Sequence, residues 1–292
     1  MMPAREIALL HNPAAGSGRG GSALPAVVRR FRDAGIAVRV LTGRDAVEAA
    51  ELGRRAVLDG VEALVVCGGD GMVGLGARAL AGSGLPLGII PTGTGNDAAR
   101  QFDLPRGDPL AAADRVIAGR TRTIDLARCG DRYIVTVLAA GFDALVNERA
   151  NTLTWPPGRL RYTRALIQEL RAFEPLRYTL DLDGEVREVE AMLVSVGNTE
   201  SLGGGIRLTH GADPADGLLD VVLIKPVSKA ELVRVYPSLF RGGHVRHPQY
   251  ERIRVRRLTL AAPGVVAYAD GERVGRLPLS VEVVPGALRV FA

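Results

Sequence analysis

The sequence predicts an α/β protein in which an N-terminal domain built on a parallel sheet precedes a mainly antiparallel β-sandwich domain. Apolar runs alternate with helical patterns up to residue 120, and short strand-like runs separated by turns follow. Two glycine-rich runs, at residues 68–71 and 91–97, each come directly after an apolar run. Alternation of strands and helices is typical of parallel sheets, and closely spaced short strands are typical of sandwiches. We therefore expect two domains, spanning residues 1–124 and 125–292.

The first domain is expected to contain four strands in one parallel sheet. Each strand is a short and almost wholly apolar run, as expected where helices cover both faces of the sheet. Helical patterns fill the intervals, and a helix is also expected after each glycine-rich run. The predicted strands are residues 7–11, 37–41, 63–66 and 87–90, and the other predicted helices are residues 23–34, 46–59 and 109–118.

The second domain is expected to be a series of short strands joined by tight turns. Asp183-Gly184 and Pro263-Gly264 are two of the turn signals that separate them. Such spacing is typical of antiparallel β architectures. The predicted strands are residues 123–128, 133–139, 177–182, 189–197, 218–225, 253–261 and 265–269, with a final pair that runs through residues 288–291.

The two glycine-rich runs are expected to lie at the carboxyl edge of the parallel sheet, where α/β proteins bind ligands. Because they lack a Cβ, Gly68, Gly69 and Gly71 let the backbone approach a polyphosphate and turn N–H groups toward it. Asp70 would repel a phosphate unless a divalent cation lay between them, which indicates Mg²⁺. With a second acid at Asp97, the two loops together predict a nucleotide site rather than two plain turns.

Composition indicates a soluble, cytoplasmic enzyme. The 292 residues, 47% of them hydrophobic and 24% charged, are enough for two domains with real cores. No apolar run approaches the roughly 20 residues that span a bilayer, and the run at residues 7–10 is too short for a signal peptide. Cys67 and Cys129 lie in apolar strand contexts, which favours buried thiols over a disulfide or a metal pair.

The net charge of +5 predicts attraction to anionic partners. Membrane surfaces and ATP both fit this charge. Only 4% of the residues are aromatic, and none interleave with basic clusters, so stacking platforms for nucleic acid are few. We therefore expect no nucleic-acid partner.

A set of short motifs, whose order and spacing span nearly the whole chain, accompanies the two loops. The motifs are Asn12-Pro13, Gly16 to Gly20, Leu41-Thr42, Gly68 to Gly71, Pro91 to Arg100, Ile124 to Leu126, Gly141 to Asp143, Asp216 to Asp220 and Asp270 to Glu272. Together they resemble the diacylglycerol-kinase-type lipid kinases, a family that includes sphingosine and ceramide kinases, and are most similar to their soluble bacterial members. The resemblance implies the same two-domain plan, with the last strand free to return to the first domain.

The resemblance implies phosphoryl transfer from ATP to a lipid hydroxyl, with Mg²⁺ as the metal. Glu272 is the expected proton acceptor, in a catalytic set with Asp270 and Asp97. In similar bacterial enzymes a Mg²⁺ is held by the aspartate that matches Asp216 and by the carbonyls at the positions that match Asp213 and Leu218. Asp70, Asp97 and Asp125 are expected to form an acidic, water-linked network joining that metal to the active site. The expected nucleotide-binding residues are Asn12, Arg19, Thr42, Gly68, Gly69, Asp70, Gly71, Gly74, Thr94 and Asn96.

The sequence departs from the family pattern after the first loop. The family usually has threonine and then an Asn-Glu pair where this chain has Met72, Gly74 and Leu75. Met72 and Leu75 motivate one alternative, a catalytically silent regulator that binds lipid or nucleotide. The other alternative is an NAD-kinase-like phosphotransferase with a soluble acceptor, against which the runs at residues 93–97 and 270–272 argue. A dinucleotide-binding reading of the glycines at residues 16–21 is weaker, because the second strand ends at Leu41-Thr42 without a ribose-binding acid. Asp183-Gly184-Glu185 repeats the late triplet and is expected to be a turn only.

A basic amphipathic helix is expected at residues 160–173. Its arginines, Arg161, Arg164 and Arg171, gather on one face, and its apolar residues gather on another. Such a helix fits transient, peripheral contact with a membrane that holds the lipid substrate. An ordinary helix that covers the β domain fits the pattern as well. The sequence leaves open whether the protein forms a homodimer.

Overall fold

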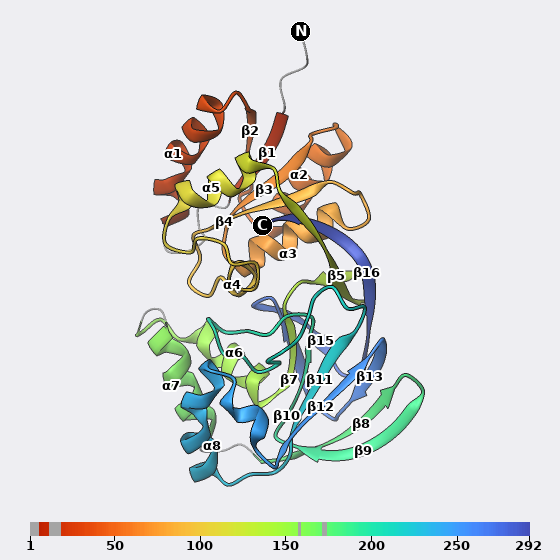
Figure 1. The fold of residues 1–292 in the computed structure, drawn as a ribbon. Helices are drawn as coiled ribbons and strands as arrows, with labels where there is room; N and C mark the ends of the chain where they lie inside the picture. Colours follow the sequence, from red (N-terminus) through yellow and green to blue (C-terminus); the bar gives the residue numbers. More distant parts are fainter. Residues whose placement is uncertain (1–5, 12–18, 157–158, 171–173) are drawn as a thin grey trace. The chain divides into compact units, whose positions relative to one another are not determined.

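The computed structural model describes residues 6–11, 19–156, 159–170 and 174–292. The chain divides into two compact units, one formed by residues 1–126 and 285–292 and the other by residues 127–284 (Figure 1). The first unit contains a parallel sheet and the second an antiparallel sandwich, so the predicted fold class is confirmed.

Five strands form the sheet of the first unit, in the order β2-β1-β3-β4-β16, and every pair is parallel. Strand β16 contributes only its end, where Arg289 and Val290 lie opposite Pro86 and Leu87. Strands β1, β3 and β4 are buried almost throughout because helices cover both faces, whereas the edge strand β2 is partly exposed. Their bounds are β1 Glu6–His11, β2 Ala37–Thr42, β3 Ala63–Gly68, β4 Pro86–Pro91 and β16 Leu279–Phe291.

Two layers of helices enclose this sheet (Figure 1). Phe31 of α1 and Val116 of α5 pack on Ile7, Leu9 and neighbouring strand residues on one face. Helices α2 and α3 pack together on the other face. Asp45 caps α2 by accepting the N–H of Glu48, as its place before the helix predicts. The helices are α1 Arg19–Asp33, α2 Ala46–Leu58, α3 Asp70–Leu80, α4 Asp97–Gln101 and α5 Pro109–Ala118.

Two sheets form the sandwich of the second unit. One is antiparallel with the order β12-β11-β10-β7-β14-β15. The other continues from β16 through β13 and β8 to β9, with β5 paired to β16 and β6 paired to β5. The strands are β5 Thr121–Cys129, β6 Arg132–Ile134, β7 Val137–Gly141, β8 Leu176–Leu182, β9 Glu185–Ala191, β10 Leu193–Gly197, β11 Leu219–Ile224, β12 Tyr250–Val255, β13 Arg257–Ala261, β14 Val266–Ala269 and β15 Glu272–Arg276.

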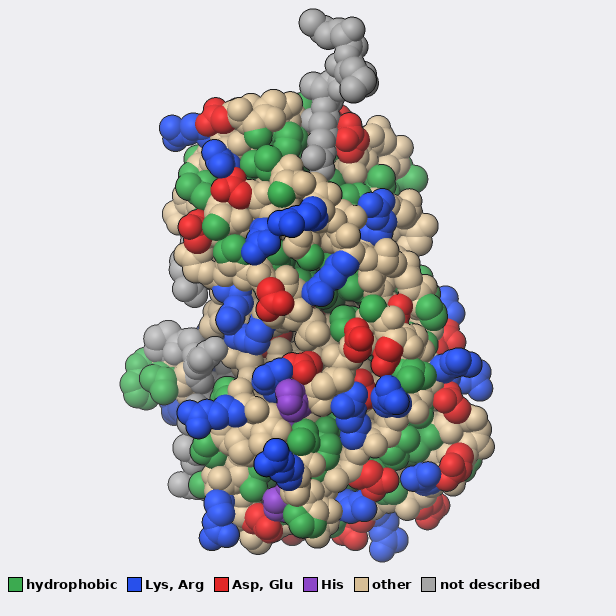
Figure 2. Space-filling model, viewed as in Figure 1, with side chains coloured by type: hydrophobic (Ala, Val, Ile, Leu, Met, Phe, Trp, Pro, Cys, Tyr) green, Lys and Arg blue, Asp and Glu red, His purple; other side chains and the backbone are tan. Residues whose placement is uncertain are grey.

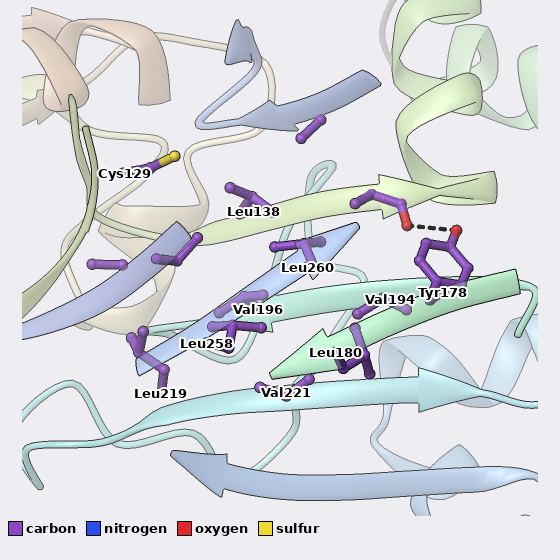
Figure 3. Packing of buried hydrophobic residues seen from close by; sticks show 14 of the residues in the cluster. Cys129, Leu138, Tyr178, Leu180, Val194, Val196, Leu219, Val221, Leu258 and Leu260 are labelled. Atoms are coloured by element: carbon purple, nitrogen blue, oxygen red, sulfur yellow. Dashed lines mark hydrogen bonds between the residues drawn. The ribbon is translucent and has the colours of Figure 1, made fainter. Parts of the chain in front are cut away.

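The core of the sandwich is made by alternate residues of facing strands (Figure 3). Leu180 and Leu258 from one sheet meet Val196 and Val221 from the other. Tyr178 is also buried there, and its hydroxyl donates to the carbonyl of Ala140 at 3.0 Å. This bond satisfies the one polar atom of a side chain that otherwise packs as an apolar residue.

Three expected strands are each two strands in the structure, because the chain changes sheets within them. The expected strand 133–139 divides between β6 and β7, the strand 189–197 between β9 and β10, and the strand 253–261 between β12 and β13. At two of these breaks, the carboxylate of an aspartate far away in sequence accepts hydrogen bonds from backbone N–H groups at the break. In the first two cases an apolar run crosses from one sheet to the other and looks continuous in sequence, which is why these predictions were wrong; in the third, Arg256 and Arg257 mark the break.

Several helices of the second unit lie in segments where no helix was expected. Helix α6 and helix α8 contribute Val146 and Leu232 to a cluster on β10 and β11. The expected basic helix is α7, although residues 171–173 lie outside the described chain. The elements are α6 Phe142–Thr152, α7 Arg159–Leu170, α8 Lys229–Val235, and the 3₁₀ turns η2 Tyr236–Phe240 and η3 Gly243–Arg246. Within the described ranges, no helix is long and apolar enough to cross a membrane.

Candidate active site

The two glycine-rich loops of the first unit contact each other directly. The N–H of Thr92 donates to the carbonyl of Gly68 at 3.0 Å. A Cβ on Gly69 would lie 3.2 Å from the Cα of Gly93, and a Cβ on Gly93 would lie 3.0 Å from the nitrogen of Gly69 and closer still to its Cα. Glycine at residues 69 and 93 therefore allows the two loops to pack backbone against backbone.

Asp70 and Asn96 hold this pair of loops in place. Asp70 reaches from the first loop to the second, where its Oδ1 accepts the N–H of Ala98 at 3.0 Å. Asn96 adopts a left-handed φ of 53°, and its side chain accepts from the N–H of Gly93 at 3.0 Å and donates to the carbonyl of Gly93 at 2.8 Å. Both side chains therefore form hydrogen bonds with backbone groups of the second loop.

Asp97 lies beside them as a buried carboxylate. Its side chain is only 4% exposed, and its Oδ1 accepts from Nη1 of Arg100 at 2.6 Å. Asp125 is buried as well, and its Oδ1 accepts the N–H of Gly286 at 2.7 Å, which ties β5 to β16. Three of the predicted acids, Asp70, Asp97 and Asp125, therefore each have a partner within the first unit.

Helix α3 places the residues that depart from the family pattern in the interior of the first unit. Met72 and Leu75 are each 4% exposed and belong to the core. The side chain of Met72 packs under Gly68, where a Cβ would lie 2.8 Å from the Cβ of Met72. Gly74 is also buried in this helix. Met72 thus fills interior space, so a threonine hydroxyl in this position would face the core.

The remaining nucleotide-binding predictions lie at the ends of strands or outside the described residues. Thr94 is exposed at the tip of the second loop, and Thr42 is exposed at the end of β2. Gly71 lies in the first turn of α3. Arg19 begins α1, and Asn12 lies outside the described residues.

Glu272, the predicted proton acceptor, lies in a hairpin of the second unit. Asp270 fixes this hairpin. Asp270 and Gly271 have φ values of 50° and 84°, as the two central residues of a type I′ turn do. The carboxylate of Asp270 accepts the N–H groups of Val135 and Thr136 at 3.0 and 2.9 Å, and the Thr136 hydroxyl at 2.6 Å. These N–H groups lie at the break between β6 and β7. Glu272 follows the turn as the first residue of β15 and is half-buried.

The triplet at residues 183–185 has the same backbone and the same carboxylate contact. Asp183 and Gly184 have φ values of 51° and 98°, and the Asp183 carboxylate accepts the N–H groups of Arg256 and Arg257 at the break between β12 and β13. Glu185 differs from Glu272 in its setting, because it is exposed and pairs with Arg187 at 2.8 Å. The two aspartates are therefore structural equivalents, and the two glutamates are not.

The predicted metal turn at residues 213–218 presents oxygen atoms to solvent. Asp213 Oδ1 accepts the N–H of Ala215, and Asp216 Oδ1 accepts the N–H of Leu218, both at 3.0 Å. The second oxygen of Asp216 lies 3.5 Å from Nη1 of Arg254. Carboxylate and carbonyl oxygens at an exposed turn are the donors that Mg²⁺ prefers, so the turn fits a hydrated Mg²⁺. Within the described ranges, no group of three or more His, Cys, Asp or Glu side chains is placed to hold a metal.

The comparisons with known proteins cover both units. A family model for the diacylglycerol kinase catalytic domain matches residues 6–129, and one for the YegS C-terminal NAD kinase beta sandwich-like domain matches residues 136–292. A relative named diacylglycerol kinase from Mycobacterium tuberculosis is 42% identical over 98% of this chain and 94% of its own length. The chain belongs to the diacylglycerol kinase family.

More distant members of the diacylglycerol kinase family agree. A diacylglycerol kinase from Bacillus subtilis is 29% identical over 92% of this chain and 90% of its own length. A crystal structure of a diacylglycerol kinase from Bacillus anthracis aligns with all of this chain and 98% of its own, with a TM-score of 0.77 and 21% identity, which shows a shared fold. Family membership makes the chain a kinase, and therefore a transferase.

The family motifs point to the two loops but miss residues that hold them. Gly93 was not singled out, although it is the second-loop residue that contacts Gly69. His11 was missed as well: it ends β1 beside Thr42 and Cys67, is 3% exposed, and its Nδ1 has no partner among the described residues. Burial lowers the pKa of the His11 imidazole. A polar residue at the end of an otherwise apolar strand is the signal that could have found it.

Proposed function

We propose that the protein is an ATP- and Mg²⁺-dependent lipid kinase that phosphorylates a hydroxyl of diacylglycerol or a related lipid. Its relatives from Mycobacterium tuberculosis and Bacillus subtilis are named diacylglycerol kinase, which supports the lipid acceptor. The observation on which the proposal chiefly rests is the pair of glycine-rich loops joined through Gly69 and Gly93. Their backbone approach leaves a surface made of peptide groups, which suits a polyphosphate.

The residues of the first unit fit a nucleotide. Gly69 is the N-cap of α3, and no side chain of the described residues caps this helix end. The dipole of this eleven-residue helix favours an anion at its N-terminal end. We infer that Gly68, Gly69, Gly71 and Thr94 contact the phosphates, while Asp70 and Asn96 hold the two loops in register.

In the proposed reaction, the lipid hydroxyl oxygen forms a bond to the γ-phosphorus of ATP as the bond from that phosphorus to the β,γ-bridging oxygen breaks. ADP leaves, and Glu272 accepts the hydroxyl proton. Mg²⁺ supplies charge neutralisation when it is bound. We assign Asp216, with the carbonyls of Asp213 and Leu218, to hold one such ion.

The proposal is tested by measuring ADP release and product formation with a panel of acceptors. We expect ATP-dependent phosphorylation of diacylglycerol or a related lipid and none of NAD. Phosphorylation of NAD alone would identify the NAD-kinase-like alternative. Binding of lipid or nucleotide without turnover would identify the silent regulator.

The metal assignment predicts a specific loss at Asp216. We expect Asp216→Ala to remove most of the rise in melting temperature that Mg²⁺ gives the wild type, because an ion that binds only the folded state stabilises it. The Mg²⁺ concentration needed for activity should rise in parallel. An unchanged melting temperature and activity across a Mg²⁺ titration would exclude this turn from the mechanism.

We further propose that the kinase touches the membrane transiently through basic surfaces of its second unit. Arg164 of α7 donates to the Trp155 carbonyl at 2.8 Å and lies over its ring, while Trp155 and Leu160 are 68% and 64% exposed. Basic side chains also gather over the region of α8, η2 and η3 (Figure 2). Three exposed arginines there have no carboxylate partner within the described ranges: Arg234, Arg241 and Arg246.

Replacing Arg161, Arg164 and Arg171 together with glutamine is expected to weaken co-sedimentation with anionic vesicles. Each arginine near an anionic surface contributes about 1 kcal/mol, so binding should also weaken as salt rises. Activity on vesicle-borne lipid should fall, while activity on a short-chain soluble analogue survives. The triple replacement of Arg234, Arg241 and Arg246 tests the second surface in the same assay.

A matched control removes the same charge from the first unit by replacing Arg29, Arg55 and Arg115, which are exposed on α1, α2 and α5. If this control lowers vesicle binding as much as the α7 triple, the effect reflects net charge alone. Equal binding of wild type to neutral and anionic vesicles would contradict the proposal.

A further inference from the structure

The proposed metal turn belongs to a long connection, residues 198–218, that joins β10 to β11. Strand β12 lies beside β11, with Arg252 opposite Val222 and Arg254 opposite Asp220. Residues two apart on a strand share a face, so Arg252 and Arg254 lie on the same side of the sheet. Both contact the 198–218 connection, but in different ways.

Arg252 binds the middle of the connection with its whole guanidinium group. Nε donates to the buried carboxylate of Asp220, Nη1 donates to the carbonyl of His210 at 3.1 Å, and Nη2 donates to the carbonyl of Gly211 at 2.9 Å. Gly211 has a φ of +87°, and a Cβ on it would lie 2.7 Å from Nη1 of Arg252. The positive φ favours glycine at residue 211, and a side chain there would also push the guanidinium away from its acceptors.

Glu200 holds the same peptide from the other side. Its Oε1 accepts the N–H of Gly211 at 2.8 Å and contacts Nδ1 of His210 at 3.1 Å, and its Oε2 accepts from Nε of Arg207 at 2.9 Å. Burial opposes ionisation of Glu200, but Arg207 and the Gly211 N–H outweigh it and lower the pKa of this carboxyl. The backbone at residues 210–211, two residues before Asp213, is therefore fixed by one cation and one anion.

Arg254 instead approaches the metal turn itself. Its Nη1 lies 3.5 Å from Oδ2 of Asp216, the oxygen that is left after Oδ1 accepts the N–H of Leu218. The Arg254 side chain is 57% exposed, so this ion pair is weak and can open. A cation that takes Oδ2 of Asp216 must displace the guanidinium.

We propose that β12 sets the Mg²⁺ affinity of this turn through two arginines of opposite effect. Arg252 is a positioning residue that fixes the turn and strengthens binding. Arg254 is a counter-charge that competes with the ion for Asp216 and weakens binding. This inference rests on the proposed Mg²⁺ site at Asp216.

The test measures the Mg²⁺ concentration that gives half of the full rise in melting temperature, without nucleotide or lipid, for four variants of the full chain. We expect Arg254→Gln to lower that concentration by about two- to fivefold, the range of an exposed ion pair. We expect Arg252→Gln to raise it by about tenfold or more, as loss of a residue that orients metal ligands does. Arg252→Lys keeps the charge but lacks the planar guanidinium group whose three nitrogens reach three separate acceptors, and it should shift the concentration in the same direction as Arg252→Gln.

Arg256→Gln is the matched control, because Arg256 is exposed and its replacement removes one positive charge, as Arg254→Gln does. The proposal fails if Arg254→Gln and Arg256→Gln tighten Mg²⁺ binding equally, or if Arg252→Gln and Arg252→Lys bind Mg²⁺ like the wild type. If the wild type responds to Mg²⁺ and Asp216→Ala abolishes that response, either of these results would contradict only the roles of the two arginines. The metal site at Asp216 would stand. A wild type that does not respond to Mg²⁺ would overturn both the site and this inference.

Discussion

Glu272→Gln is expected to lower turnover by about 10² or more while leaving the fold and nucleotide binding unchanged. The amide has nearly the shape of the carboxylate but cannot accept the proton of the lipid hydroxyl. The hairpin should keep its position, because Asp270 holds it through Val135 and Thr136. The measurements are kcat with a saturating lipid acceptor, melting temperature and ATP affinity.

Glu185→Gln is the control for this experiment. Glu185 follows an Asp-Gly turn with the same left-handed backbone, and its contact with Arg187 is exposed. We expect turnover close to that of the wild type. Equal loss in both variants, or full activity in Glu272→Gln, would show that Glu272 is not the proton acceptor.

Gly93→Ala is expected to destabilise the first unit and abolish most of the ATP binding. The added methyl group would lie 2.8 Å from Oδ1 of Asn96 and 3.0 Å from the nitrogen of Gly69. These neighbours are backbone and a side chain held by two hydrogen bonds, so neither can move freely. Forcing a methyl group into such a site costs about 1–3 kcal/mol. Thermal unfolding and ATP titration of the full chain measure the two effects.

Gly107→Ala is the comparison for that variant. Gly107 lies in an exposed loop of the same unit, and a Cβ there meets nothing within 4 Å. Its stability and ATP affinity should match those of the wild type. Wild-type behaviour of Gly93→Ala would mean that the loops separate at little cost and that their contact does not shape the nucleotide site.

Much of the fold could be predicted because its signals are local. Runs such as Leu64 to Val66 are apolar because both faces of their strand are covered, and this is visible in a few residues. Asp45, the N-cap of α2, and Asp108, the N-cap before Pro109 of α5, mark helix starts for equally local reasons. The breaks at residues 135–136 and 192 could not be predicted in this way, since the apolar pattern continues across them.

Residues of the candidate site divide along the same line. The glycine loops, the Asp-Gly turn at residues 270–271 and the aspartates at 213 and 216 are determined by the sequence itself, because glycine and aspartate favour these conformations without help from the rest of the chain. Only the tertiary structure decided their contacts. Asp270 meets Val135 from 135 residues away, and Arg252 meets His210 from 42 residues away. Such contacts depend on which strands become neighbours, and local patterns do not contain that information.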